Sequence, residues 1–140
     1  MELNIATLAS IYKALSDETR LRILYILRER PLCVCEIMGA LDITQTKTSR
    51  HLIYLKNAGL LEAKKEDRWM LYRIREYLPE ELGMLIDETI TLVGKTRGVA
   101  EVEKRLDTIL NNESIYRQTF GIDGKRALDS SKISKSHTAI

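Results

Sequence analysis

The stretch CVCEIMGALDITQTKTSRHLIYLKNAG, residues 33–59, decides the fold of this 140-residue chain. Apolar residues recur three and four positions apart in its first part, which predicts a short helix over 33–41. Two turn residues follow, and Thr44 is placed to cap a second helix over 44–58. Gly59 suits the left-handed position that often ends a helix. The stretch therefore predicts two helices joined by a tight turn.

Helical patterns precede this stretch, and a hairpin pattern follows it. Apolar spacing predicts a helix over 5–15, and Ser16 is placed as the N-cap of the next helix, which stops before Pro31. After Gly59 the period changes, because LLEAKKE and WMLYRIR show rough alternation with aromatic or β-branched members. Asp67 and Arg68 separate these two runs, so they predict a β-hairpin.

The helical period returns from Pro79, and a further apolar stripe covers 99–110. Gly94 and Gly98 lie between the two stripes, so the pattern leaves open one kinked helix or two. Beyond residue 112 the chain is polar, with scattered apolar residues. We therefore expect one domain over 1–112 and a flexible tail over 113–140.

Two helices, a tight turn and a hairpin make a winged helix-turn-helix, a mainly α fold with a small β-hairpin (α+β). Helix 33–41 is expected to cross the DNA backbone, and helix 44–58 to enter the major groove by its first turns. Residues 44–75 carry eight basic and three acidic side chains, a net charge of +5 within a chain of +2. The candidate DNA contacts are Gln45, Thr46, Lys47, Ser49, Arg50 and His51 on the helix, and Lys64, Lys65 and Arg68 at the hairpin tip.

His51, Trp69 and Tyr72 in this region each have a role other than DNA contact open to them. His51 is suited either to a phosphate contact or to a hydrogen-bonded position within the helix. Trp69 and Tyr72 are expected to pack within the wing rather than to touch bases.

Both cysteines of the chain lie at the start of the first predicted DNA-reading helix, as Cys33 and Cys35. Two cysteines at this spacing do not form a secreted disulfide framework, no signal peptide pattern is present, and no apolar run approaches the roughly 18 residues that span a bilayer. We therefore expect a cytoplasmic protein with no membrane partner, whose thiols bind a soft ion. A helix N-terminus is expected to lower their pKa.

The spacing of the two cysteines constrains how they can act together. Residues two apart on an α-helix point about 200° apart, so an intact helix cannot present both thiols to one ion. Either Cys33 lies at the cap, or ion binding distorts the first turn. In both cases capture of an ion acts on the helix that supports the DNA-reading helix.

The chain resembles the ArsR/SmtB family of metal-responsive repressors. The stretches ALSDETRLRIL, LCVCEI, TKTSRHLIYLKNAGLL and RWMLYRI carry this likeness, which extends over roughly residues 5–95. The resemblance implies a homodimer on an inverted-repeat operator, with the first helix and the helix from Pro79 at the dimer interface. Cys33 and Cys35 match the arsenite and antimonite sensors of the family, and Met38 stands where those sensors often have a third cysteine.

The resemblance thus implies a repressor that leaves double-stranded DNA when trivalent arsenic, antimony or another thiophilic metal ion binds the two thiols. The ion is an effector, and no catalytic cofactor and no enzymatic activity are expected. The alternatives are a repressor switched by oxidation of the cysteine pair, a dithiol redox enzyme, and a winged helix that only binds other proteins.

Overall fold

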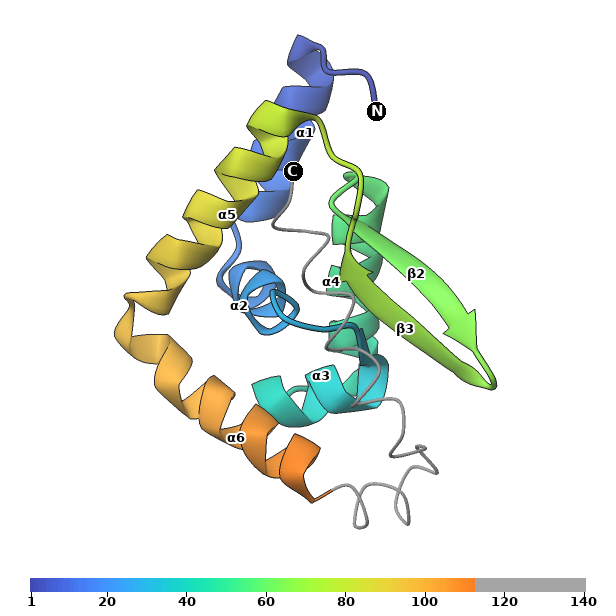
Figure 1. The fold of residues 1–140 in the computed structure, drawn as a ribbon, viewed down its shortest axis with the longest axis vertical. Helices are drawn as coiled ribbons and strands as arrows, with labels where there is room; N and C mark the ends of the chain where they lie inside the picture. Colours follow the sequence, from blue (N-terminus) through green and yellow to red (C-terminus); the bar gives the residue numbers. More distant parts are fainter. Residues whose placement is uncertain (113–140) are drawn as a thin grey trace.

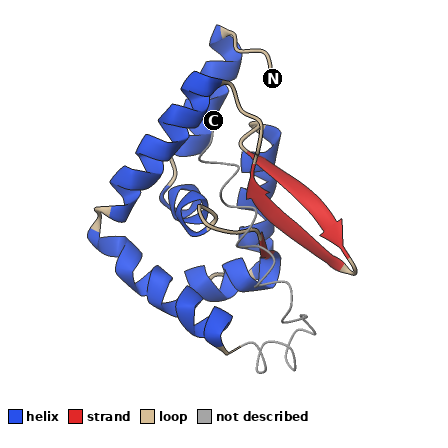
Figure 2. Cartoon of the chain, viewed as in Figure 1, coloured by secondary structure: helices blue, strands red, loops and turns tan. Residues whose placement is uncertain are grey.

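The computed structural model describes residues 1–112, and the expected tail at 113–140 lies outside the described residues. The helices lie together, and the hairpin of a small antiparallel sheet projects from one side of them (Figures 1 and 2), which confirms the predicted fold class. In chain order the elements are α1 (Ile5–Leu15), α2 (Glu18–Ile26), β1 (Leu32–Cys33), α3 (Val34–Leu41), α4 (Gln45–Asn57), β2 (Leu61–Glu66), β3 (Trp69–Ile74), α5 (Glu80–Gly94), the 3-10 turn η1 (Arg97–Val99) and α6 (Ala100–Asn111).

The helix-turn-helix pair forms as the local sequence predicts. Asp42 ends α3 in the left-handed conformation, at φ 56°, and its N–H donates to the Met38 carbonyl at 2.8 Å. Thr44 then caps α4, because its hydroxyl oxygen accepts the Lys47 N–H at 3.2 Å. Gly59 follows α4 at φ 85°, a region that glycine enters without strain. Polar groups at both ends of the turn therefore define where α3 ends and where α4 begins.

The sheet has the order β1-β3-β2, with both pairings antiparallel. Its hairpin is the predicted one, and Asp67 makes the turn at φ 56°. The two-residue strand β1 is an addition, because residues 32–33 carry no strand period of their own. It exists because Leu32 and Cys33 pair with Tyr72 and Leu71 of β3.

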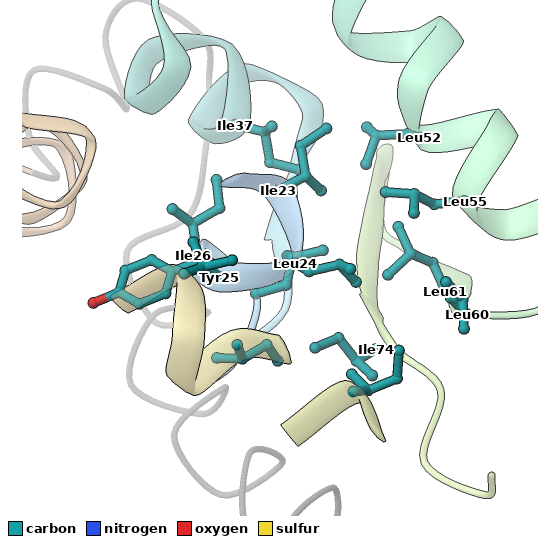
Figure 3. Close-up of a cluster of buried hydrophobic side chains, with 14 of the residues drawn as sticks. Ile23, Leu24, Tyr25, Ile26, Ile37, Leu52, Leu55, Leu60, Leu61 and Ile74 are labelled. Carbon is teal, nitrogen blue, oxygen red and sulfur yellow. The ribbon is translucent and has the colours of Figure 1, made fainter. Parts of the chain in front are cut away.

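The main core is centred on α2, which lies in the middle of the ribbon (Figure 1). Figure 3 shows side chains from α3, α4 and the sheet converging on this helix. The labelled members are Ile23, Leu24, Tyr25, Ile26, Ile37, Leu52, Leu55, Leu60, Leu61 and Ile74, all of which are buried. A rigid core of this kind fixes α3 and α4 relative to each other, because protein interiors are close-packed.

Two helices, not one kinked helix, follow the wing. The turn η1 separates α5 from α6, and α6 then packs against α3. Arg105 of α6 donates from Nε to the Ala40 carbonyl at 2.8 Å, while Glu103 accepts from Arg28 at 2.8 Å and from the Tyr25 hydroxyl at 3.1 Å. The last described helix is therefore attached to both α2 and α3.

One predicted cap is displaced by a residue. Ser16 ends α1, and Asp17 is the N-cap of α2, since its carboxylate accepts the Arg20 N–H at 3.1 Å. Ser16 instead donates its hydroxyl to the Lys13 carbonyl at 2.9 Å. Within residues 1–112, no helix combines the length and apolar character that crossing a membrane requires.

Candidate nucleic-acid interface and thiol site

Helix α4 presents one apolar face to the core and one polar face to solvent. Thr48, Leu52 and Leu55 are each fully buried, and the Thr48 hydroxyl donates to the Thr44 carbonyl at 2.8 Å. These three residues recur at helical spacing, so most of the remaining positions of the first two turns face outward, while His51 is also buried. Ala58, the C-cap of α4, is half-buried.

Most of the candidate DNA contacts lie on accessible surface. On α4, Gln45, Thr46, Lys47 and Arg50 are exposed and Ser49 is half-buried. At the hairpin the three basic side chains are also exposed, two of them on β2 and one in the turn before β3. These side chains are Lys64, Lys65 and Arg68. The helix N-terminus and the hairpin tip therefore offer two separate groups of positive or hydrogen-bonding side chains, as phosphate and base contacts require.

His51 is the exception among these residues. It is 9% exposed, and its Nδ1 lies 3.3 Å from Nη1 of Arg20. Since a guanidinium can only donate, Nδ1 is the acceptor and the ring is neutral. Burial lowers the pKa of His51, and the charges of Arg20, Arg50 and Lys47 lower it further against the opposing effect of Asp17. Of its two open roles, the structure shows the hydrogen-bonded one, and the DNA contact of His51 stays a prediction.

Arg20 is a functional neighbour that the sequence reasoning missed. Its guanidinium donates to the Ala14 carbonyl at 2.7 Å and to the Lys13 carbonyl at 3.2 Å, and it lies 4.1 Å from the centroid of the Tyr54 ring. It therefore ties the end of α1 and the start of α2 to the solvent-facing side of α4. A signal was present, because Arg20 precedes Ile23 and Leu24 at the three- and four-residue spacing of a buried helix face.

The cysteine pair lies at the junction of β1 and α3. Cys33 has extended backbone angles (φ −83°, ψ 166°) and is the N-cap, so it stands outside the helix that begins at Val34. The Sγ atoms of Cys33 and Cys35 lie 2.6 Å apart, with one thiol donating to the other. Of the two ways to bring the thiols together, the first is observed: the cap position turns Cys33 toward Cys35 without distorting α3.

Both thiols are enclosed. Cys33 is 1% and Cys35 9% exposed, and with Leu71 they form a small buried cluster against which Trp69 packs. Trp69 is half-buried, and it packs on this cluster as the sequence analysis expects. The Cys33 N–H donates to the carboxylate of Glu36, itself buried, at 3.0 Å.

The acidity of Cys33 differs from the expectation. The hydrogen bond with Cys35 raises the pKa of the Cys33 thiol, and burial and the charge of Glu36 raise it further. The expected lowering by the helix N-terminus is therefore wrong for Cys33. The pKa of Cys33 is raised because burial and nearby negative charge both disfavour the thiolate.

Among the described residues, the two sulfurs are not part of a larger cluster of metal-binding side chains. Within residues 1–112, no group of three or more His, Cys, Asp and Glu side chains is placed to hold a metal ion. Met38 is half-buried on α3, three residues after Cys35. The protein side of the candidate thiol site is therefore a pair of sulfurs at the N-cap of α3.

Comparisons with known proteins agree with this architecture. A family model described as "Bacterial regulatory protein, arsR family" matches residues 17–63, from the N-cap of α2 into β2. The arsenical resistance operon repressor of Escherichia coli K12 is 44% identical over 79 residues, which are 56% of this chain and 68% of that protein. An arsenic resistance transcriptional regulator of Pseudomonas putida, ArsR2, is 38% identical over 97 residues, 69% of this chain and 83% of that protein.

Solved structures show the same fold. HlyU from Vibrio cholerae shares 32% identity at a TM-score of 0.57, over 66% of this chain and 97% of that chain. The homodimeric winged helix-turn-helix DNA-binding domain of a possible ArsR-family regulator from Mycobacterium bovis shares 30% identity at a TM-score of 0.56, over 65% and 82%. The predicted winged helix and the predicted family are thus both confirmed, and this chain belongs to the arsR family of bacterial regulatory proteins.

Proposed function

We propose that this protein is a transcriptional repressor that leaves its DNA operator when trivalent arsenic, trivalent antimony or another thiophilic ion binds Cys33 and Cys35. The single observation that carries this proposal is the pair of Sγ atoms, 2.6 Å apart, at the N-cap of α3. Names of relatives support it, since those in Escherichia coli and Pseudomonas putida are an arsenical resistance repressor and an arsenic resistance regulator. As a DNA-binding regulator with thiols, it would act in the reducing cytoplasm.

The proposed DNA contacts are the exposed groups of α4 and the wing. Gln45, Arg50 and Ser49 would reach base edges in the major groove, while Thr46 and Lys47 would bind phosphates at the helix start. The basic side chains of the hairpin tip, Lys64, Lys65 and Arg68, would hold flanking phosphates. Because phosphate contacts release counterions, operator affinity should fall steeply with salt.

We propose a homodimer on an inverted repeat. Exposed apolar side chains on α1 and α5 support it, since Ile5 is 83%, Tyr12 54%, Met84 62% and Leu92 58% exposed. Apolar residues of this size favour burial against a second surface. In Figure 1 the hairpin and α5 lie on opposite sides of α2, so a dimer through α5 would leave the wing clear.

The proposed switch acts through α3. Arsenious acid can condense with both thiols, each thiol proton leaving with an arsenic-bound hydroxyl as water, so the raised pKa of Cys33 does not prevent capture. Joining the N-cap to the first turn by a bound ion changes the start of α3, which packs on α4. A change in DNA affinity of about 5–150-fold needs only about 1–3 kcal/mol of coupling.

The test is operator binding by wild type and by Cys33→Ser/Cys35→Ser, using DNA from upstream of the gene, with and without arsenite. The double variant should bind DNA as wild type does and should stay bound in arsenite. Met38→Leu is the matched control on the same helix, and it should still be released, because the proposed site consists of the two thiols. Normal release of the double variant would place the sensor elsewhere.

Oxidation of the pair is a second candidate, favoured by the same short Sγ–Sγ distance. A peroxide would take two electrons from the two thiols, form a disulfide and leave as water or alcohol. To distinguish oxidation from metalloid binding, the operator-binding assay is repeated with hydrogen peroxide in place of arsenite, on the same protein and operator. Release by peroxide that dithiothreitol reverses, together with no response to arsenite, would replace the metalloid proposal by the redox one.

A further inference from the structure

A row of paired residues across the sheet connects the two thiols to the wing. Cys33 of β1 pairs with Leu71 of β3, and Leu71 pairs in turn with Lys64 of β2. Directly opposed residues of antiparallel strands place their side chains on the same face of the sheet. Cys33, Leu71 and Lys64 therefore lie in one row, which runs from the thiol site to one of the basic side chains of the hairpin tip.

The packing around the thiols involves the wing as closely as α3. Cys33, Cys35 and Leu71 form a buried cluster distinct from the main core, with Trp69 packed on it. Leu71 and Trp69 both belong to β3, and α3 also contacts this strand. An ion that joins the two sulfurs needs room, and in a close-packed interior that room must come from these neighbours.

We propose that ion capture by Cys33 and Cys35 also displaces the wing, with Leu71 as the positioning residue that couples the thiols to β3. This inference rests on the proposed function, since it supposes that the wing binds DNA and that the thiols bind the effector. It adds a second route to the one through α3.

The pairing of β2 with β3 would transmit such a displacement to the hairpin tip. Strands β2 and β3 are paired continuously from Leu61 opposite Ile74 to Glu66 opposite Trp69. A shift of β3 at Leu71 therefore moves β2 with it, because breaking the ladder would leave backbone groups unpaired. The tip would lose its phosphate contacts even if α4 stayed in place.

The experiment compares release by arsenite in three proteins on the same operator. The wing variant is Lys64→Ala/Lys65→Ala/Arg68→Ala, whose three side chains are all exposed, so the fold should be retained. The matched control removes the same charge elsewhere, as Lys95→Ala/Arg97→Ala/Lys104→Ala, also at exposed positions. Each dissociation constant is measured at one salt concentration, with and without arsenite.

The wing variant should bind DNA more weakly than wild type. Arsenite should raise its dissociation constant by a factor that is at least about two- to threefold smaller than the factor in wild type, which is the low end of coupling between interacting sites. The control should respond as wild type does. An equal factor in wild type and wing variant overturns the inference, and the proposed function then stands, since wild type is still released.

A second measurement reads the same coupling in reverse and needs no arsenite. Because linkage is reciprocal, an operator that holds the wing must also hold the thiols in their enclosed state. Alkylation of the cysteines by iodoacetamide should therefore slow on saturating operator DNA in wild type and in the control, and slow less in the wing variant. Equal protection in all three proteins overturns the inference. If arsenite fails to release wild type, the effector assignment fails and this measurement alone decides the role of the wing.

Discussion

Replacing Arg20 by methionine is expected to lower the free energy of unfolding by about 2–4 kcal/mol. The Arg20 side chain is 13% exposed, and methionine retains its length and part of its apolar packing. What the substitution removes is the guanidinium, which donates to the Ala14 carbonyl at 2.7 Å and to the Lys13 carbonyl at 3.2 Å and lies over the Tyr54 ring. These contacts join α1, α2 and α4, so they are lost together.

The magnitude follows from the separate contacts. A hydrogen bond from a charged donor contributes about 1.5–3 kcal/mol, and a cation–π contact at a partly exposed site about 0.5–1 kcal/mol. The Lys13 carbonyl keeps the Ser16 N–H at 3.3 Å and the Ser16 hydroxyl at 2.9 Å, so its loss is discounted. The ion pair of Arg20 with Asp17, at 3.9 Å, is long and adds little.

The assay is urea unfolding followed by the emission of Trp69, the single tryptophan of the chain. With a slope of about 2 kcal/mol per molar urea, the midpoint should fall by about 1–2 M. Arg22→Met is the matched control on the same helix, because within residues 1–112 the ion pair of Arg22 is with the exposed Glu18 at 3.6 Å, and its loss should cost about 0.5 kcal/mol or less. All proteins are compared at one concentration, since a dimer's stability depends on it. A loss for Arg20→Met no larger than that for Arg22→Met would refute the reasoning.

Three further predictions concern α4 and the residues at its two ends. Gly59→Ala should cost about 1–2 kcal/mol in urea, because φ is 85° there, and Gly59→Asn should cost less; equal costs would contradict the backbone explanation. Thr44→Ala should cost about 1 kcal/mol by removing the cap on the Lys47 N–H, and Thr44→Ser, which keeps the hydroxyl, should not. The pKa of His51 is lowered below its ordinary 6.5 by burial, so the unfolded chain takes up a proton first as the pH falls. The contribution of neutral His51 to the free energy of unfolding is therefore complete above about pH 6.5 and is lost as the pH falls toward the folded-state pKa. His51→Gln should remove that part of the decline between about pH 7.5 and pH 5.5, and an unchanged profile would show that His51 does not contribute.

The elements defined by local chemistry were predictable from the sequence. The turn before α4, its Thr44 cap and Gly59 after it all depend on neighbours within a few residues, and all three are observed. The hairpin with Asp67 in its turn is of the same kind. The Ser16 cap was wrong by one residue because Ser16 and Asp17 are adjacent and both suit an N-cap, so composition alone does not choose between them.

The candidate site was predictable only in its residue types. The sequence places Cys33 and Cys35 at one point of the chain, and the helical period indicated the outward polar face of α4. The burial of His51 was not predictable, because it depends on Arg20, which is 31 residues away in the chain. The raised pKa of Cys33 likewise comes from enclosure, which no spacing rule describes.

By itself, the amino-acid sequence determined the helix-turn-helix, the hairpin, the thiol pair and the family, because each is written in residues close together in the chain. The tertiary structure alone decided that β1 exists, that α6 packs on α3, and that the thiols lie against Leu71 of the wing. These contacts join segments about 40 to 70 residues apart, and they form because the apolar faces of separate elements are buried together. That burial is a property of the whole packed chain, so no local pattern specifies which faces meet.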